Sequence, residues 1–199
     1  MSLGMQACGY EPVLVEPGLH GARNAQQRGL MNIVCSTLED AEFTQHSLPA
    51  IGIFDVLEHI AEDHKFLDKL RNVLSRSGRL YVSVPTYGFL WSVDDVFAGH
   101  ARRYTKTSLI RDVERAGFDV EYCTYFFSPL PLPIFLARTL PSFLSIRNET
   151  NSGGGAHEHV SSKRSGRIMR AVFDWELRAI AARRSIPVGS SCLLVAKPK

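Results

Sequence analysis

The chain has 199 residues, of which 45% are hydrophobic and 22% charged. This length fits one domain, and this composition excludes a disordered chain, a collagen and a disulfide-dense secreted scaffold. The net charge of +3 is too small to indicate nucleic acid as the partner. No apolar run reaches the ~18 residues of a membrane-spanning helix, and no signal peptide is visible. The four cysteines (Cys8, Cys35, Cys123 and Cys192) form no CxxC pair, so we expect buried thiols and a reducing, cytoplasmic location.

In chain order, the first half predicts the tail of a helix at 1–9, a strand at 12–16, a helix at 19–28 ended by Gly29, and a strand at 32–35. A third strand is predicted at 51–57, where nearly continuous apolar residues indicate burial on both faces. A helix capped by Asp63 follows, with an apolar stripe of Phe66, Leu67, Leu70, Val73 and Leu74.

The second half predicts a strand at 79–84, an aromatic and charged loop at 86–103, and a helix capped by Thr105 and ended by Gly117. A long strand at 118–127 precedes a proline-rich apolar stretch and a glycine-rich loop at 148–160. A basic helix at 161–184 and a strand at 191–196 close the chain.

Strands that alternate with helices predict an α/β, Rossmann-like fold with a mostly parallel sheet and helices on both faces. The last two strands are separated by an insertion and not by a clear crossover helix, which favours an antiparallel strand at one edge. We therefore expect one domain over 1–199, with insertions at about 86–104 and 128–187.

Glu16 follows the first predicted strand directly. Open α/β sheets bind nucleotides at the carboxyl ends of their strands, where a carboxylate can accept hydrogen bonds from a ribose diol. A solvated loop residue is the plainer interpretation of a single acid at this place.

Three polar residues interrupt the apolar run where the strand at 51–57 ends. The segment is Phe54-Asp55-Val56-Leu57-Glu58-His59-Ile60. The plain interpretation is a strand end and a helix cap. Residues of metal-ligand type are dense here, but the segment has neither HExxH spacing nor a cysteine pair. We therefore expect no metal site. The residues weighed for it are Glu58, His59, Glu62, Asp63 and His64.

Several segments, in this order, resemble the class I S-adenosylmethionine (SAM)-dependent methyltransferases. They are LVEP at 14–17, STLED at 36–40, IFDVLEHI at 53–60, LSRSGRLYVSVP at 74–85, ERAGF at 114–118 and VGSSCLLVAKPK at 188–199. The loop WSVDDVFAGHARRYT at 91–105 is similar to a bacterial methyltransferase-11/23-like subgroup. The resemblance covers the chain from about residue 8 to its end, and it implies SAM as the cofactor.

The resemblance also implies roles for single residues. Glu16, followed by Pro17, would bind the cofactor ribose; Thr37, Leu38 and Glu39 would lie by the adenine; Phe54, Asp55 and Leu57 would flank the methionine end. Glu58 and His59 would face the site of methyl transfer, where His59 is the one near-neutral base and so the candidate catalytic residue. A histidine that only hydrogen-bonds in the pocket is the alternative.

The sequence departs from this family in one respect, because it has no D-x-G-x-G-x-G turn before residues 1–9. The family's turn approaches the carboxypropyl and amino groups of the cofactor, and its strand lies in the middle of the sheet. We therefore expect an N-terminally incomplete fold that binds SAM weakly or not at all. A gap between the strands at 12–15 and 51–57 favours a homodimer or higher oligomer.

The loop after the fourth strand would cover the active site in the resembling family. Its acids, histidine and arginine are suited to an anionic or hydroxylated substrate. A surface loop held by salt bridges is the alternative. The candidate substrate residues are Trp91, Asp95, His100, Arg103 and Tyr104.

The apolar stretch 125–146 and the basic helix 161–184 indicate either peripheral membrane contact or a lid or dimer surface. Arginines would meet anionic lipid and phenylalanines the acyl chains. These residues are Arg164, Arg167, Arg170, Arg178, Arg183, Arg184, Phe126, Phe127, Phe135 and Phe143.

The resemblance therefore favours a SAM-dependent methyltransferase that acts on a small-molecule or lipid-linked acceptor. A non-catalytic binding module with the same fold is the first alternative. The missing glycine turn favours it, whereas the presence of Glu16, a residue expected to bind the cofactor, is evidence against it. A nicotinamide-dependent dehydrogenase is the second, and the absence of GxGxxG opposes it.

Overall fold

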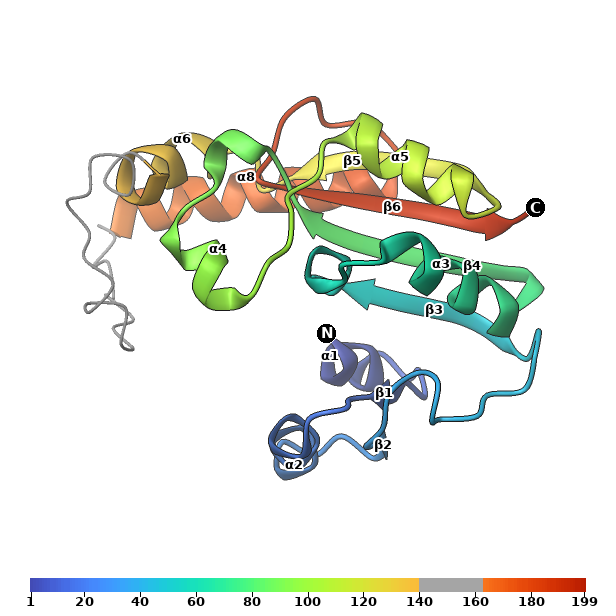
Figure 1. Ribbon diagram of the computed structural model, residues 1–199. Coiled ribbons are helices and arrows are strands. Elements are labelled where there is room, and N and C mark those ends of the chain that lie inside the picture. Colours follow the sequence, from blue (N-terminus) through green and yellow to red (C-terminus); the bar gives the residue numbers. More distant parts are fainter. Residues whose placement is uncertain (140–162) are drawn as a thin grey trace. The chain divides into compact units, whose positions relative to one another are not determined.

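The computed structural model describes residues 1–139 and 163–199 (Figure 1). These residues form two compact units, Met1–Ser47 and Leu48–Lys199. The loop predicted at 148–160 and Phe143 lie outside the described residues.

The first unit contains two short parallel strands and two helices. Leu14 lies opposite Ile33 in the strand pair. Gly29 has a φ of 90° directly after the second helix, which confirms the predicted helix end, because glycine adopts this left-handed conformation without strain. In order, the elements are α1 (Ser2–Ala7), β1 (Val13–Val15), α2 (Leu19–Gln27) and β2 (Asn32–Val34).

The second unit contains a four-stranded sheet in the order β3-β4-β6-β5. β3 and β4 are parallel, whereas β6 is antiparallel to both β4 and β5. The α/β class and the antiparallel pair near one edge are as the sequence predicts, but β5 is the outermost strand and β6 lies inside it. The strands are β3 (Leu48–Phe54), β4 (Leu74–Pro85), β5 (Phe118–Phe126) and β6 (Ser191–Pro198).

Helices and short turns surround this sheet. In Figure 1, α3 and α5 lie on the near face of the sheet and α8 is drawn behind it. Thr105 caps α5 as predicted, because its Oγ1 accepts a hydrogen bond from the backbone of Ser108 at 3.1 Å. The elements are η1 (Leu57–His59), α3 (Asp63–Val73), η2 (Gly88–Leu90), α4 (Val93–Ala98), α5 (Lys106–Arg115), α6 (Pro131–Ile134), the π-helical turn η3 (Phe135–Thr139) and α8 (Lys163–Ala181).

The core of the second unit lies between the sheet and the helices α3 and α5. The apolar stripe predicted on α3 supplies Leu67 and Leu70, since the 3.6-residue period puts them on the face toward the sheet, whereas Leu74, the last residue of that stripe, is buried as the first residue of β4. Fully or almost fully buried side chains include Leu67, Leu70, Leu74, Leu80, Val82, Val84, Leu109, Val113, Leu194 and Ala196.

The strand predicted at 51–57 differs from expectation. It begins at Leu48 and ends at Phe54, because Asp55 has a φ of 54° and turns the chain out of the extended conformation. It is an outer strand of its sheet, and Ile53 is its one buried residue, so burial on both faces was wrong. Within the described residues, β1 pairs with β2 and β3 with β4, and β1 does not pair with β3.

The expectation that all cysteines are buried was also wrong. Cys8 and Cys35 are exposed, whereas Cys123 and Cys192 are buried. The sulfur atoms of this second pair lie 3.4 Å apart, because the antiparallel register of β5 and β6 brings the two strands together.

Helix α8 confirms the basic helix predicted near the C-terminus, and one buried carboxylate anchors it. Glu176 is 3% exposed and accepts hydrogen bonds from the backbone N–H groups of Phe127 and Ser128, at 2.9 and 2.7 Å. The phenyl rings of Phe127 and Phe173 pack edge to face beside it. In the described part of the chain, no helix combines the length and the apolarity that crossing a bilayer requires.

Candidate functional site

Glu16 directly follows β1, and Thr37 to Glu39 lie three residues or more beyond the end of β2. The two strands are parallel, so both segments lie at the same edge of this small sheet. Oε1 of Glu16 accepts a hydrogen bond from the backbone N–H of Gly18 at 2.9 Å, which fixes the carboxylate beside the first turn of α2. Pro17, Thr37 and Glu39 are exposed, and Leu38 is half-buried.

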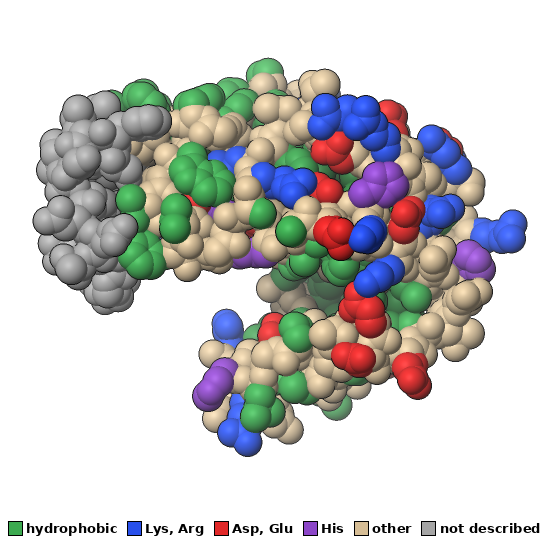
Figure 2. Space-filling view, in the orientation of Figure 1, with side chains coloured by type: hydrophobic (Ala, Val, Ile, Leu, Met, Phe, Trp, Pro, Cys, Tyr) green, Lys and Arg blue, Asp and Glu red, His purple; other side chains and the backbone are tan. Residues whose placement is uncertain are grey.

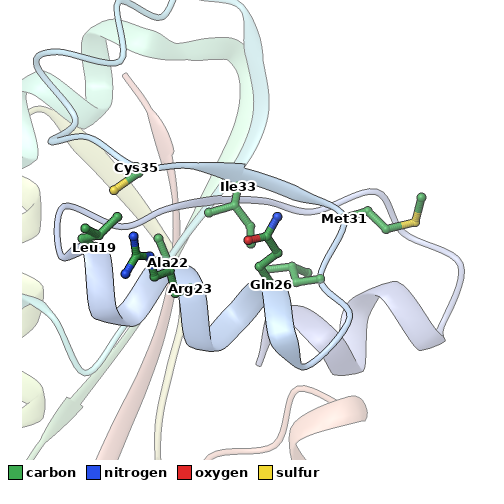
Figure 3. A pocket seen from close by; sticks show the side chains of 8 residues that line it. Leu19, Ala22, Arg23, Gln26, Met31, Ile33 and Cys35 are labelled. Carbon is green, nitrogen blue, oxygen red and sulfur yellow. The ribbon is translucent and has the colours of Figure 1, made fainter.

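A shallow pocket of about 340 Å³ lies between α2 and β2 in the same unit (Figure 3). None of the sequence-predicted cofactor residues contributes to its wall. The lining side chains are Leu19, Ala22, Arg23, Gln26, Leu30, Met31, Ile33 and Cys35. This pocket therefore gives no support to the predicted cofactor site.

In the second unit, the end of β3 presents Asp55 at the surface. The backbone N–H of Asp55 donates to the carbonyl of Ser83 at 3.0 Å, and the Ser83 hydroxyl donates to Oδ1 of Asp55 at 3.2 Å. The ring of Phe54 folds back over Gly52, where a Cβ atom would overlap it. The side chain of Leu57 is fully buried, so it presents no surface to a ligand.

Glu58 is the most unusual polar residue of the described chain. It is 1% exposed, and neither of its carboxylate oxygens has a hydrogen-bond partner among the described residues. Burial, with a smaller contribution from Asp55, raises the pKa of Glu58 to about 7. Its carbonyl oxygen accepts a hydrogen bond from the backbone of Ala101 at 2.7 Å, which attaches the loop after α4 to η1.

Two histidines lie beside Glu58. The ring centroids of His59 and His100 are 4.7 Å apart, in an edge-to-face arrangement. Nδ1 of His59 lies 3.3 Å from the carbonyl oxygen of Gly99, and Nδ1 of His100 lies 2.8 Å from Oδ1 of Asp95. Because a carbonyl and a carboxylate only accept hydrogen bonds, both Nδ1 atoms donate, and in a neutral ring Nε2 then carries the lone pair.

Asp95 holds the loop that carries His100. It is 1% exposed, and its carboxylate accepts hydrogen bonds from Nε and Nη2 of Arg103 at 2.7 and 3.1 Å and from the backbone N–H of Ser92 at 2.9 Å. Burial by itself raises the pKa of Asp95, but hydrogen bonds from Arg103, His100 and Ser92 outweigh it and lower that pKa below its usual value. Arg103 also donates to the carbonyl of Thr86 at 3.1 Å, so its guanidinium joins both ends of the loop.

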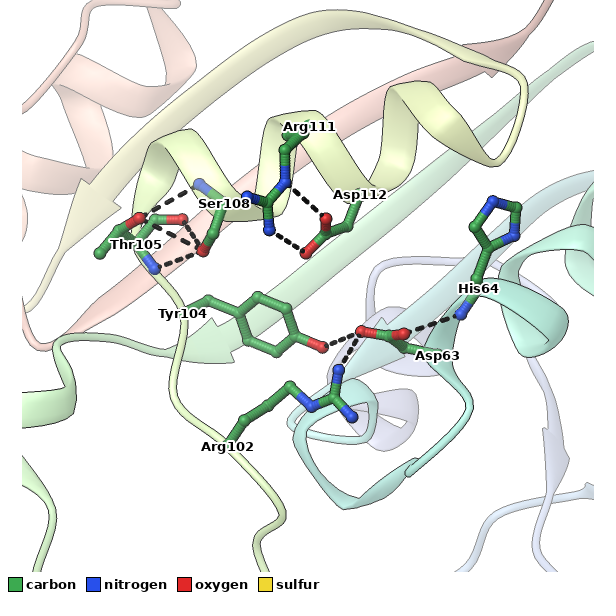
Figure 4. A network of polar contacts seen from close by, with 8 residues as sticks. All are labelled: Asp63, His64, Arg102, Tyr104, Thr105, Ser108, Arg111 and Asp112. Carbon is green, nitrogen blue, oxygen red and sulfur yellow. Dashed lines mark hydrogen bonds and ion pairs between the residues drawn. The ribbon is translucent and has the colours of Figure 1, made fainter.

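A second carboxylate, Asp63 at the start of α3, holds the end of the same loop (Figure 4). Its Oδ2 accepts hydrogen bonds from the Tyr104 hydroxyl at 2.9 Å and from Nη1 of Arg102 at 2.7 Å. Burial and this hydrogen bond raise the pKa of Tyr104 above its ordinary value. No sequence pattern indicated that Asp63 would meet residues about 40 positions further along the chain.

Three of the five predicted substrate residues, Asp95, Arg103 and Tyr104, therefore hold the loop in place. This is the alternative given above, a loop held by salt bridges. Trp91 and His100 are half-buried, and His100 reaches the cluster at η1. The structure thus brings Glu58, His59 and His100 together at the carboxyl end of β3, and it places Glu16 and Thr37 at the corresponding end of β1 and β2.

Comparison with known proteins shows the family to which the chain belongs. A family model described as a methyltransferase domain (Methyltransf_23) matches residues 1–122. No curated protein matches the chain.

Solved structures with the same fold are distant in sequence. A SAM-dependent methyltransferase from Thermotoga maritima is 15% identical, with a TM-score of 0.55, over 93% of this chain and 72% of that one. One from Archaeoglobus fulgidus is 14% identical, with a TM-score of 0.53, over 92% and 74% of the two chains. A geranyl diphosphate methyltransferase in complex with SAM is 11% identical, with a TM-score of 0.55, over 93% and 67%. The chain therefore belongs to the Methyltransf_23 family of methyltransferase domains, whose cofactor is S-adenosylmethionine.

Proposed function

We propose that this chain transfers the methyl group of SAM to a small-molecule or lipid-linked acceptor. The observation that carries the proposal is the cluster of Glu58, His59 and His100 at the carboxyl end of β3, beside a loop that the carboxylates of Asp95 and Asp63 hold in place. This is the edge of an α/β sheet at which ligands bind.

The described residues fit the ribose part of the cofactor. Glu16 is half-buried at the end of β1, and its Oε1 is already fixed by Gly18, so the carboxylate is oriented before a ligand arrives. A ribose diol donates two hydrogen bonds to such a carboxylate. Thr37, Leu38 and Glu39 would lie by the adenine, and Phe54 and Asp55 by the methionine end.

When bound, SAM supplies an electrophilic methyl group, which an acceptor lone pair attacks as the carbon–sulfur bond breaks. The protein aligns the acceptor with that bond, which is the main source of acceleration in such a displacement. In the metal-free protein, Nε2 of His59 has the free lone pair that takes the acceptor's proton, because Nδ1 donates to Gly99.

An apolar surface supports an acceptor with a hydrophobic part. Figure 2 shows hydrophobic side chains gathered where α4 and α6 lie, and these residues are more than half exposed. The aromatic rings of Tyr125, Tyr87 and Phe89 stack in a row toward Phe135. The exposed residues are Phe89, Val96, Phe97, Leu132 and Leu136.

The test is a titration of the isotope-labelled chain with SAM, followed by amide chemical shifts in NMR spectra, which detect weak binding. We expect shifts at Glu16, Thr37 and Asp55. Glu16→Gln should weaken binding by about 1.5–3 kcal/mol, which is the range for a hydrogen bond to a charged group. The exposed Glu11 provides the control Glu11→Gln, which should change nothing.

Two results would count against the proposal. One is a SAM titration that shifts no amide at these positions. The other is a Glu16→Gln variant that binds as tightly as wild type. Transfer of radiolabelled methyl groups to hydroxylated acceptors, with and without an isoprenoid chain, then separates an enzyme from a binding module.

A further inference from the structure

The buried carboxylate of Glu58 has no hydrogen-bond partner within the part of the chain that the structure describes. Taking a carboxylate out of water without a hydrogen bond or a counter-ion is costly. Both of its oxygens lack hydrogen-bond partners among the described residues, and Arg103, whose charge acts on Glu58, is engaged by Asp95. A positively charged ligand from outside the chain would supply such a partner.

His59 and His100 show what kind of group fits. One ligand atom from each of Glu58, His59 and His100 lies within 4.8 Å of the other two. Ligand atoms around an ion at metal–ligand distances of about 2.0–2.2 Å lie roughly 3–3.5 Å apart. A movement of about 1–2 Å by side chains on η1 and the following loop is therefore enough to enclose an ion.

The hydrogen bonds of the two histidines favour a metal ion over an organic cation. Each Nδ1 donates to an oxygen, of Gly99 or of Asp95, so in the neutral ring each Nε2 has the lone pair that can bind a metal. A carboxylate that holds the second ring nitrogen of a metal-binding histidine is a common arrangement, and it makes the imidazole a stronger ligand. Asp95 holds His100 in this way at 2.8 Å.

We propose that Glu58, His59 and His100 bind a divalent transition-metal ion, of which zinc is the first to test. Two histidine nitrogens and one carboxylate form a known ligand set for zinc and for other first-row metals, and three protein ligands leave at least one position open. The loop at 99–101, which Ala101 attaches to the carbonyl of Glu58, supplies the third ligand.

An oxygen donor of the acceptor would suit the position that the three protein ligands leave open. This second step rests on the proposed function, whereas the metal site does not. A metal-bound hydroxyl has a lowered pKa, so the ion would take over the role of the base while His59 serves as a ligand.

The expectation of no metal site considered only residues 58–64 and the spacing within that segment. His100 lies outside it, and no sequence motif joins it to Glu58. That expectation therefore stays open until metal binding is measured.

The test is direct metal binding, without cofactor or activity. The purified chain is treated with a chelator and then titrated with Zn²⁺ by calorimetry and with Co²⁺ by visible absorption. We expect one ion per chain and a visible Co²⁺ spectrum. Loss of an outer partner of a metal ligand weakens binding by about 10–100-fold, so Glu58→Gln and His100→Gln should each weaken it by at least that much.

His64→Gln is the matched control, because His64 is exposed on α3 and has a carboxylate neighbour, Asp68, at 3.4 Å. It should bind Zn²⁺ as wild type does, and circular dichroism should show that all variants are folded. Binding that is equal in wild type, Glu58→Gln and His100→Gln would mean adsorption to surface histidines and would overturn the proposal. Absence of Zn²⁺ and Co²⁺ binding to wild type would also overturn it.

The acceptor step has its own readout. Acetohydroxamate, a small chelator with two oxygen donors, should shift the spectrum of the Co²⁺-loaded chain if a position is open. An unchanged spectrum would refute the open position. Failure of SAM to bind would refute the proposed function and leave the metal result intact, so the two failures are distinguishable.

Discussion

Asp95 offers the sharpest test of how the loop over the candidate site is held. Its carboxylate is 1% exposed, and Arg103, its main partner, is 10% exposed. Asp95→Asn keeps the volume but replaces one oxygen with an amide that cannot accept hydrogen bonds, and it leaves the charge of Arg103 buried. Breaking a buried ion pair from one side costs about 3–5 kcal/mol.

For a chain of this size, 1 kcal/mol corresponds to about 2–4 °C in Tm. We therefore expect Asp95→Asn to lower Tm by roughly 6–20 °C. Thermal unfolding followed by tryptophan fluorescence is the assay, because Trp91 lies two residues before α4 and reports on this loop.

Glu62→Gln is the control for the loss of a carboxylate. Glu62 and Lys65 form an ion pair at 2.7 Å, with both side chains about 70% exposed. An exposed pair of this kind contributes about 0–1 kcal/mol. An Asp95→Asn variant no less stable than Glu62→Gln would refute the buried ion pair as the support of the loop. The double variant with Arg103→Met should cost less than the sum of the single changes, because it removes both charges together.

Three further predictions concern the second unit. Gly189→Ala should prevent stable folding, since its Cβ would overlap the backbone of Phe126; soluble protein with a wild-type melting curve would contradict this. Thr105→Ala should cost about 1 kcal/mol through loss of the cap of α5, measured by urea unfolding, and no change would show that the cap is not needed. The hydrogen bond from Arg79 lowers the pKa of Glu121, so this pair stabilises the fold above pH 4.5 and the stabilisation is lost as the pH falls. Glu121→Gln should flatten this acid dependence of Tm in a pH series of melting curves. An unaltered dependence of Tm on pH would count against the prediction.

Local sequence signals determined the individual elements well. The end of α2 at Gly29, the cap of α5 at Thr105 and the apolar stripe on α3 were all predicted, because helix period, capping and the left-handed preference of glycine act within a few residues. The class of fold followed from the alternation of strands and helices, and the family followed from the order of short motifs.

Tertiary structure decided what lies beside what. The early end of β3 depends on the positive φ of Asp55, which the apolar pattern does not show. The inner position of β6 depends on its pairing with both β4 and β5. These features arise from backbone pairing between distant segments, and a hydrophobic pattern reports only which residues avoid water.

The same limit applies to the candidate site. The sequence marked His59 and His100 separately, but their contact depends on the loop that Asp95 and Arg103 hold. It marked Tyr104 as a substrate residue, whereas the fold buries its hydroxyl against Asp63. Whether a polar side chain binds a ligand or holds a loop depends on which partner the fold brings within hydrogen-bond distance. Partners that lie about 40 residues away in the chain are chosen by the packing of the whole unit.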